Sequence, residues 1–397
     1  MRNKICEENV SDLYHRSAAI IDLACISHNL AVVREKAPGR KIIAMVKANA
    51  YGHGLVRTAE HLALDGVDYL GTAFVEEALT LRQAGITTPI ITSGPFSKFQ
   101  IGLFIENKVD FTVAAVGTLK LIDEAAAFYG KRVNVHLKID TGMMRIGIRH
   151  SNADKLFDAA RHAKNCNVVS IYSHFASADC EDTSFQRLQL ERFLEATSYY
   201  EKHGIERPLL QIANSAAICR MPESHLDMVR PGIMLYGYHP SAQSEAAADL
   251  KPALSLRAKV MYFKVILAGS SVGYGRTWTA PRNCRSVTIP VGYGDGYSRD
   301  LSNKGEVLIR GKRYPTIGTI CMDQTVVCLG DGEAYNGDEV VLIGSQGSES
   351  ITADDVAKLT GTISYEVLTA ISSRVPRIYI NGDGADKGVS PQPSFGG

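Results

Sequence analysis

Eight short apolar runs, separated by helix-like stretches, fill most of residues 18–240 and constrain the fold more than any other feature of this sequence. The runs lie at 41–47, 68–74, 89–94, 110–115, 133–140, 167–175, 208–214 and 227–235. They are continuously apolar rather than alternating, as strands buried on both faces should be. Eight strand–helix units predict a (β/α)8 barrel. An open doubly wound sheet is the alternative, although no G-x-G-x-x-G follows the first run.

The pattern of the sequence changes beyond residue 250. Short β-rich runs are separated there by Gly, Pro, Asn or Asp, which predicts a mainly-β domain, a small barrel or a sandwich. The expected segments are an N-terminal extension packing near the C-terminal domain (1–17), the barrel (18–250), the β domain (251–382) and a disordered Gly/Pro/Ser-rich tail (383–397).

Charge and composition exclude several classes of function. The chain carries 43 Lys and Arg against 42 Asp and Glu, so no basic excess favours nucleic acid as a partner. No apolar run approaches the ~20 residues of a membrane span, and the charged start is unlike a secretory signal. The eight cysteines are scattered without a C-x-x-C, which favours reduced thiols in a cytoplasm and no metal site.

Polar and cationic residues gather where a barrel holds its active site, at the carboxyl ends of the strands. They are Lys47, Lys138, Arg145, His174, Asn214, Ser215, Arg230 and Gly232. Taken singly, a lysine at a strand end more often reaches solvent, and a strand histidine more often completes the core. Together, a lysine able to form a Schiff base, a phosphate cup after the last two strands and an arginine facing a ring nitrogen suggest pyridoxal 5′-phosphate (PLP).

Long motifs then carry a resemblance to a known family. The stretch VKANAYGHG (46–54) resembles the PLP-lysine signature of bacterial alanine racemases. Further motifs follow in the family's order: HLKIDTGMMRIGI (136–148), MVRPGIMLYG (228–237), VGYGRTW (272–278), GTICMDQ (318–324) and SYEVLTAISSRVPRIY (364–379). The resemblance implies an N-terminal PLP barrel and a C-terminal β domain, in a head-to-tail homodimer with shared active sites.

The same resemblance implies the catalytic pair. Lys47 is implied to form the Schiff base and to act as the base on the D-substrate side. Tyr274 of the other subunit is implied to be the opposite base, with His174 bonded to it. Racemisation needs proton removal from one face and delivery to the other, which two groups on opposite faces perform directly.

Binding residues are implied in the same way. Arg230 would bond the pyridine nitrogen, and Arg145 the phenolic oxygen and the substrate carboxylate. The implied contacts of the phosphate and its surroundings are Tyr51, Asn214, Ser215, Gly232, Ile233 and Tyr365. The backbone N–H of Met322, beside Asp323, would meet the substrate carboxylate, and Tyr293 would narrow the entrance.

Two positions need separate comment. Many relatives carry a histidine where this chain has Gln211, which can accept a hydrogen bond from Arg230 but cannot become charged. Lys138 stands where some relatives have a carbamylated lysine, and the sequence permits that modification.

The function that the resemblance implies is interconversion of L- and D-alanine, with D-alanine supplied to peptidoglycan. Racemisation of serine or another amino acid is the nearest alternative, because pocket size excludes an extra hydroxyl poorly. A PLP-dependent decarboxylase on the same two-domain plan and a non-catalytic single-barrel PLP-binding protein are the alternatives from other classes. The β domain and Tyr274 argue against the second of these.

Overall fold

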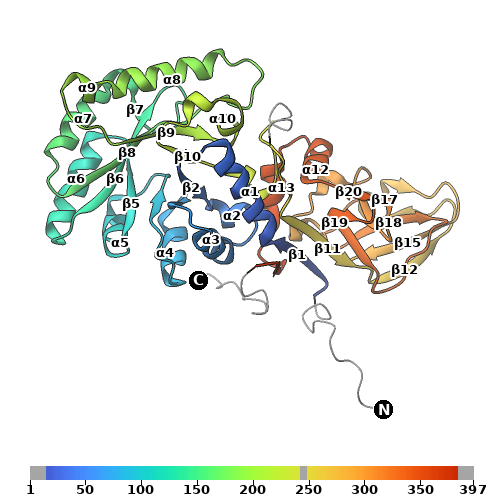
Figure 1. Ribbon diagram of the computed structural model, residues 1–397. Helices are drawn as coiled ribbons and strands as arrows, with labels where there is room; N and C mark the ends of the chain where they lie inside the picture. The colour runs from blue at the N-terminus through green and yellow to red at the C-terminus, as the bar shows by residue number, and fades with distance from the viewer. Residues whose placement is uncertain (1–14, 242–247, 383–397) are drawn as a thin grey trace. The chain divides into compact units, whose positions relative to one another are not determined.

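The computed structural model describes residues 15–241 and 248–382 (Figure 1). The chain divides into two compact units, each with its own core. The barrel unit comprises Cys25–Ala50 and Gly54–Lys251. The β unit comprises the described residues before Cys25, the short segment Tyr51–His53 and the described residues from Pro252 onward. Residues 18–24 and 51–53, expected in the barrel domain, thus cluster with the β unit, and most of the expected extension and the tail lie outside the described residues.

Eight parallel strands form the barrel. They are β2 (Lys41–Met45), β3 (Tyr69–Thr72), β4 (Ile90–Thr92), β5 (Val109–Val113), β6 (Val133–Asp140), β8 (Cys166–Tyr172), β9 (Leu209–Asn214) and β10 (Met228–Arg230). The sheet closes because β5 pairs with β6 at one side while β10 pairs with β2 at the other. The predicted barrel is therefore confirmed, and the open sheet is excluded. A ninth strand, β7 (Ile148–Arg149), pairs only with β6.

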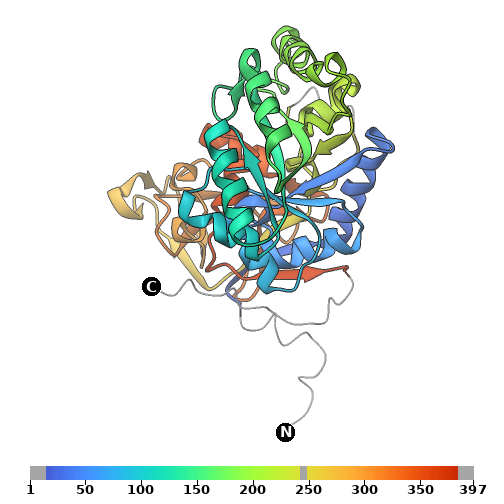
Figure 2. The same ribbon diagram turned by 90° about the vertical axis from the view of Figure 1, so that its left-hand side faces the viewer.

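Helices surround these strands (Figure 2). They are α1 (Leu23–Lys36), α2 (Lys47–Tyr51), α3 (Leu55–Leu64), α4 (Val75–Gln83), η1 (Lys98–Gln100), α5 (Ile101–Glu106), α6 (Val116–Phe128), η2 (His150–Asn152), α7 (Ala153–His162), α8 (Ser184–Thr197), α9 (Tyr199–Lys202), α10 (Ser215–Arg220), η3 (Pro222–Ser224) and η4 (Ile233–Tyr236). Helix α7 illustrates the packing. Its buried residues Ala153, Leu156, Phe157 and Ala160 recur at helical spacing, so one stripe faces the strands.

The β unit is a mainly antiparallel sheet with two helices. Its elements are β1 (Ser17–Asp22), β11 (Leu254–Lys259), β12 (Tyr262–Ile266), β13 (Ser271–Val272), η5 (Tyr274–Arg276), β14 (Trp278–Thr279), β15 (Cys284–Ile289), η6 (Tyr293–Asp295), η7 (Arg299–Leu301), β16 (Glu306–Ile309), β17 (Lys312–Ile317), β18 (Thr325–Gly330), β19 (Glu339–Gln346), β20 (Glu349–Ile351), α12 (Ala353–Thr360), α13 (Ser364–Ala370) and β21 (Arg377–Ile380). Burial alternates along β11 and β18, as expected for strands with one face on a core. Strand β1 pairs with β11 and, in parallel, with β21.

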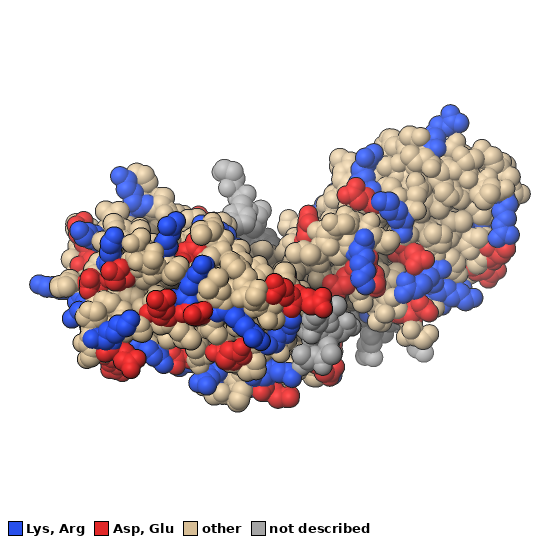
Figure 3. Space-filling view, turned by 90° about the horizontal axis from the view of Figure 1, so that it is seen from above, with Lys and Arg blue, Asp and Glu red and all other residues tan. Residues whose placement is uncertain are grey.

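The surface carries charges of both signs. On the face of the barrel unit that Figure 3 shows, basic and acidic side chains are interspersed. This agrees with the net charge of +1 and leaves no one-signed field on that face. Within the described ranges, no helix is long and apolar enough to cross a membrane.

Candidate active site

Lys47 follows β2 and opens an unusual turn. The prediction that it ends the strand is wrong by two residues, because β2 stops at Met45. Ala48, Asn49 and Ala50 have φ between 53° and 56° and ψ between 43° and 54°, and Tyr51 also has a positive φ of 52°. Four consecutive non-glycine residues in the left-handed region are rare, since each costs roughly 1–2 kcal/mol. Backbone strain of this kind is typical of functional sites.

Hydrogen bonds from neighbouring elements hold this left-handed turn. Glu77, on α4, accepts from the Ala48 amide at 2.6 Å and from the Ala73 amide at 2.8 Å. The side-chain oxygen of Asn49 accepts from the amide of Leu55, the first residue of α3, at 2.8 Å. The turn is thereby fixed to two helices, and Lys47 is held at the barrel mouth. Sequence reasoning missed Glu77, whose only signal is its place at the start of a helix.

Burial lowers the pKa of Lys47 from its ordinary value, and the positive charges of Arg145 and Arg230 lower it further. Glu77 opposes this shift because its negative charge favours the ammonium form. A lowered pKa increases the share of neutral amine, the form that reacts with a carbonyl group. Lys47 therefore has the environment of a nucleophilic lysine rather than of a solvent-exposed one.

Arg230 ends β10 and is almost fully buried, 7% exposed. Its guanidinium donates to Oε1 of Gln211 at 2.8 Å, to the carbonyl of Ser173 at 2.7 Å and to the carbonyl of Ile212 at 3.2 Å. The expected bond to Gln211 is thus confirmed. Burial lowers the pKa of Arg230 to about 10, so it stays charged at neutral pH.

His174 lies just beyond β8, which ends at Tyr172, and it bonds to Arg230. Nη2 of Arg230 donates to Nδ1 of His174 at 3.2 Å, so this ring nitrogen carries no proton. The pKa of His174 is well below its ordinary value, first because of burial and then because of the charges of Arg230, Lys138, Arg145 and Lys47. That four cations act on one imidazole shows that the predicted basic residues of the barrel unit converge.

Lys138 is buried in the barrel, with its ammonium 4.4 Å from the ring centre of Tyr172. Burial lowers its pKa well below the ordinary value, and Arg230 and Arg145 add to the shift. A neutral amine in this setting is available for chemical modification. The aromatic face of Tyr172 also lies 5.2 Å from the Arg230 guanidinium, and sequence reasoning missed this tyrosine.

The loops after β9 and β10 form a polar cup. The amide of Gly232 donates to Oγ of Ser215 at 2.8 Å, and Ile233 follows as the fully buried start of η4. Asn214 caps α10 by accepting from the Ala217 amide at 3.1 Å, so its side chain holds the loop in shape. Backbone N–H groups and a hydroxyl in such a loop are the groups that bind phosphate.

The remaining predicted residues lie in the β unit. Tyr274 opens η5 and is 72% exposed, while Tyr293 and Met322 are 43% and 52% exposed. Tyr365, on α13, lies with its ring centre 6.0 Å from that of Tyr51, which clusters with this unit. The carbonyl of Tyr274 accepts from the Thr319 hydroxyl at 2.8 Å, which fixes the η5 turn.

Arg374 fixes the loop that carries Met322 and Asp323. It donates to Asp323 at 2.6 Å and to the buried carboxylate of Asp295 at 2.8 and 3.2 Å. The amide of Gly294 donates to the Met322 carbonyl at 2.9 Å. Sequence reasoning missed Arg374 and Asp295, although Arg374 lies within the quoted family motif at 364–379.

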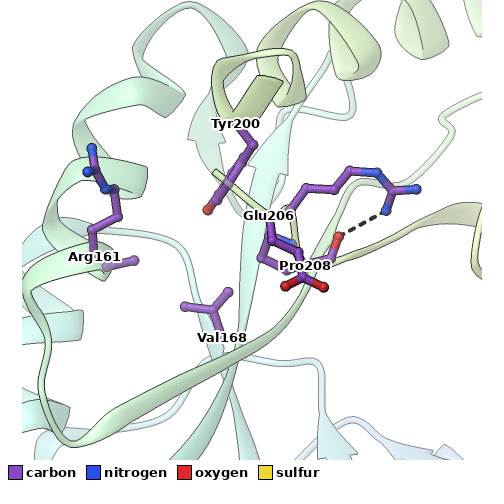
Figure 4. Close-up of a pocket in the computed structure, with 7 residues that line it drawn as sticks. Arg161, Val168, Tyr200, Glu206 and Pro208 are labelled. Atoms are coloured by element: carbon purple, nitrogen blue, oxygen red, sulfur yellow. Dashed lines mark hydrogen bonds between the residues drawn. The ribbon is translucent and has the colours of Figure 1, made fainter. Parts of the chain in front are cut away.

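A separate pocket of about 340 Å³ lies on the outside of the barrel unit (Figure 4). It is lined by Ala160, Arg161, Val168, Tyr200, Glu206, Arg207 and Pro208, none of which belongs to the predicted site. Arg207 is turned to the carbonyl of Pro208 at 3.1 Å, and burial raises the pKa of Tyr200 and keeps its phenol neutral. Within residues 15–241 and 248–382, no cluster of three or more potential metal ligands occurs.

The donor set at the barrel mouth fits PLP. The cofactor needs an amine for its aldehyde, donors for its phosphate and a partner for its pyridine nitrogen. Lys47 could supply the amine, the loops of Ser215 and Gly232 could supply phosphate donors, and Arg230 could supply a guanidinium. A closed (β/α)8 barrel with these groups at its mouth, followed by a mainly-β unit, defines a class of two-domain barrel enzymes.

Comparison with known proteins gives the family. The alanine racemase N-terminal domain matches residues 21–240, and the C-terminal domain matches residues 253–379. The alanine racemase of Cutibacterium acnes is 44% identical over 92% of this chain and 98% of its own length. The chain belongs to the alanine racemase family.

Solved structures agree with this assignment. The alanine racemase of a D-cycloserine-producing Streptomyces lavendulae superposes with a TM-score of 0.90 at 38% identity, over 94% of this chain and 99% of that one. The alanine racemase of Bartonella henselae, solved with covalently bound pyridoxal phosphate, has a TM-score of 0.84 at 29% identity, over 92% of this chain and 100% of that one.

Proposed function

We propose that this protein is a PLP-dependent alanine racemase that interconverts L- and D-alanine. The observation that carries the proposal is the burial of the Lys47 amine at the barrel mouth, where the charge of Arg230 acts on it. Arg230 is itself held by hydrogen bonds, and the chain belongs to this family. When bound, PLP withdraws electrons from the substrate α-carbon and so makes its proton acidic.

Lys47 would hold the aldehyde carbon of the cofactor, and Arg230 would face the pyridine nitrogen. The phosphate would be bound by Ser215, Gly232 and Ile233, with Tyr51 and Tyr365 beside it. Because Arg230 stays charged and donates hydrogen bonds, it would leave the ring nitrogen of a bound cofactor without a proton. The cofactor would then supply a weaker electron sink, which would favour return of the proton over side reactions.

Two bases would move the α-proton. Lys47 would act on the D-substrate side and Tyr274 of the partner subunit on the opposite side. The 72% exposure of Tyr274 supports its donation to another subunit. Arg145 and the Met322 amide would bind the substrate carboxylate, with Asp323 beside it and Tyr293 at the entrance. His174, neutral and fixed by Arg230, would bond the partner's Tyr274 and influence its proton affinity.

The proposal includes a homodimer and a carbamylated Lys138. Exposed apolar residues on the β unit support a homodimer, because a large apolar surface favours burial against a partner. They are Met261, Tyr262, Phe263, Val265, Leu267, Tyr274, Met322 and Ile363. The lowered pKa of Lys138 supports carbamylation, which would turn this buried neutral amine into an anion whose charge would oppose that of Arg145. We place the enzyme in the cytoplasm, where it would supply D-alanine for peptidoglycan.

Chiral analysis of the product tests the proposal. Purified protein with PLP should convert L-alanine to the racemic mixture, and removal of PLP should abolish the conversion. Lys47→Ala should abolish it too, whereas Lys120→Ala, at an exposed lysine on α6, should retain it. Conversion of L-serine with a higher kcat/KM than L-alanine, or decarboxylated product, would overturn the assignment in favour of the corresponding alternative.

A further inference from the structure

A line of buried polar side chains crosses the interior of the barrel. It runs from Arg230 on β10 through Gln211 on β9, Ser170 on β8 and His136 on β6 to Asp110 near the start of β5. The three middle residues are 0% exposed, and the two at the ends are 6–7% exposed. Polar groups this deep in an apolar barrel are costly unless each finds a partner. Each of these five does.

The hydrogen bonds of this line all point in one direction. Arg230 donates to Oε1 of Gln211 at 2.8 Å, so Nε2 of the same amide donates to Oγ of Ser170 at 2.7 Å. The Ser170 hydroxyl is then free to donate to Nδ1 of His136 at 2.7 Å. That makes Nε2 of His136 the protonated nitrogen, and it donates to the Asp110 carboxylate at 3.2 Å.

Reversing any one member would break the line. A flipped Gln211 amide would set its NH2 group against the Arg230 donor. The opposite His136 tautomer would direct both His136 and Gln211 as donors to Ser170, and it would remove the His136 donor from Asp110, which would keep the donation from Asn134 at 3.3 Å. In the described part of the chain no carboxylate forms an ion pair with Arg230, and burial is the leading influence on that guanidinium. Asp110 is the anion at the end of its hydrogen-bonded line.

We propose that Gln211, Ser170, His136 and Asp110 are a positioning relay that fixes the orientation of Arg230. The inference rests on the proposed function, in which Arg230 faces the pyridine nitrogen of PLP. The relay sets the Gln211 amide so that its oxygen meets the guanidinium, and Asp110 sets the amide through the serine and the histidine. Residues two to four hydrogen bonds from Arg230 thereby influence the reaction without touching cofactor or substrate.

The first test needs no variant. Nuclear magnetic resonance of the full chain with ¹⁵N-labelled histidine, with and without PLP, reports which nitrogen of His136 carries the proton. The relay requires Nε2–H at neutral pH. Protonation at Nδ1, or at both nitrogens, overturns it, whatever the activity of the enzyme.

The second test uses the holoenzyme loaded with PLP that carries ¹⁵N in the pyridine ring. Ser170→Ala cuts the line at a residue that does not touch Arg230. We expect kcat for L-alanine to fall about fivefold with KM nearly unchanged, and the pyridine nitrogen resonance to move. The matched control is Thr92→Val, which removes another buried barrel hydroxyl, one that is bonded to Thr72 at 2.9 Å. It should leave both readouts as in the unmodified enzyme.

Further variants test whether Asp110 and Ser170 act on Arg230 through the same line of hydrogen bonds. Asp110→Asn keeps an acceptor for His136 and should retain most of kcat, whereas Asp110→Leu should behave like Ser170→Ala. Adding Asp110→Leu to Ser170→Ala should cost little more, because the line is already cut. Equal effects of Ser170→Ala and Thr92→Val on resonance and kcat, or additive effects in the double variant, overturn the relay alone. Unmodified protein that neither binds PLP nor racemises alanine overturns the proposed function, and the tautomer measurement still decides the hydrogen-bonded line.

Discussion

At the scale of single residues, the backbone after Lys47 is the least expected feature of the molecule. Ala48 has φ 53° and ψ 54° and is exposed, so its methyl group contributes strain but little packing. Ala48→Gly should therefore stabilise the barrel unit by roughly 0.5 kcal/mol, as relief of strain outweighs the greater freedom of glycine in the unfolded chain.

The control for this prediction is Ala31→Gly. Ala31 is also exposed but lies in the right-handed helix α1, where glycine should destabilise by about 1 kcal/mol. Urea unfolding measures the free energy of unfolding of both variants, which should rise for Ala48→Gly and fall for Ala31→Gly. A destabilised Ala48→Gly variant would show that the left-handed turn is not strained.

His174 gives a prediction on pH. Its pKa in the folded chain is well below that of an unfolded histidine, so around pH 6.5 the unfolded state binds more protons. The free energy of unfolding should then fall as pH drops below about 6.5. His174→Asn keeps an acceptor for Arg230 and removes the titration. The free energy of unfolding of both proteins is measured without PLP from pH 7.5 to 5. As the pH drops, it should fall more steeply for the unmodified protein than for His174→Asn. Parallel curves would contradict the lowered pKa of His174.

At the scale of elements, Arg374 joins the loops around η6 and Met322, while Arg16 also binds Asp295 of η6 at 2.5 Å. Arg374 spans Asp295 and Asp323, which its forked guanidinium reaches together and a lysine cannot. Arg374→Lys should loosen the Met322 loop and raise KM for alanine by about fivefold, with a smaller change in kcat.

The control is Arg310→Lys in the same unit, since Arg310 pairs with Asp338 at 2.8 Å outside the site. Its kinetics should match those of the unmodified enzyme. A KM that is unchanged in Arg374→Lys would argue against substrate binding by the Met322 amide.

At the scale of the whole molecule, the proposal divides each active site between two subunits. Lys47→Ala and Tyr274→Phe should each be inactive as pure dimers. In a mixed dimer with shared sites, one site carries both changes and the other carries neither. Random reassociation of equal amounts should restore roughly a quarter of all sites.

The measurement is racemase activity after dissociation and remixing, with subunit exchange confirmed by mass. If Tyr274 served its own subunit, every site would keep one lesion and mixed dimers would stay inactive. Confirmed exchange without recovered activity would thus rule out the shared site and leave the dimer itself intact.

The sequence by itself determined the barrel and much of the candidate site. Continuous apolar runs can be buried on both faces only in a covered parallel sheet, so eight of them predicted the closed barrel, and strand ends located Lys47, Ser215 and Arg230. Long motifs then supplied the roles that residue type left open.

Other features were decided by tertiary structure alone. Strand β1 was missed because its partners β11 and β21 lie more than two hundred residues further along the chain. The left-handed turn after Lys47 opposes the local preference of alanine, and it is held because Glu77 accepts from the Ala48 amide and Asn49 accepts from the amide of Leu55 at the start of α3. The line from Arg230 to Asp110 joins five different strands, and no local pattern reveals which polar groups meet inside a barrel. Local sequence determines the helices and strands. Only their packing decides which distant side chains offset the backbone strain and stabilise the buried charges.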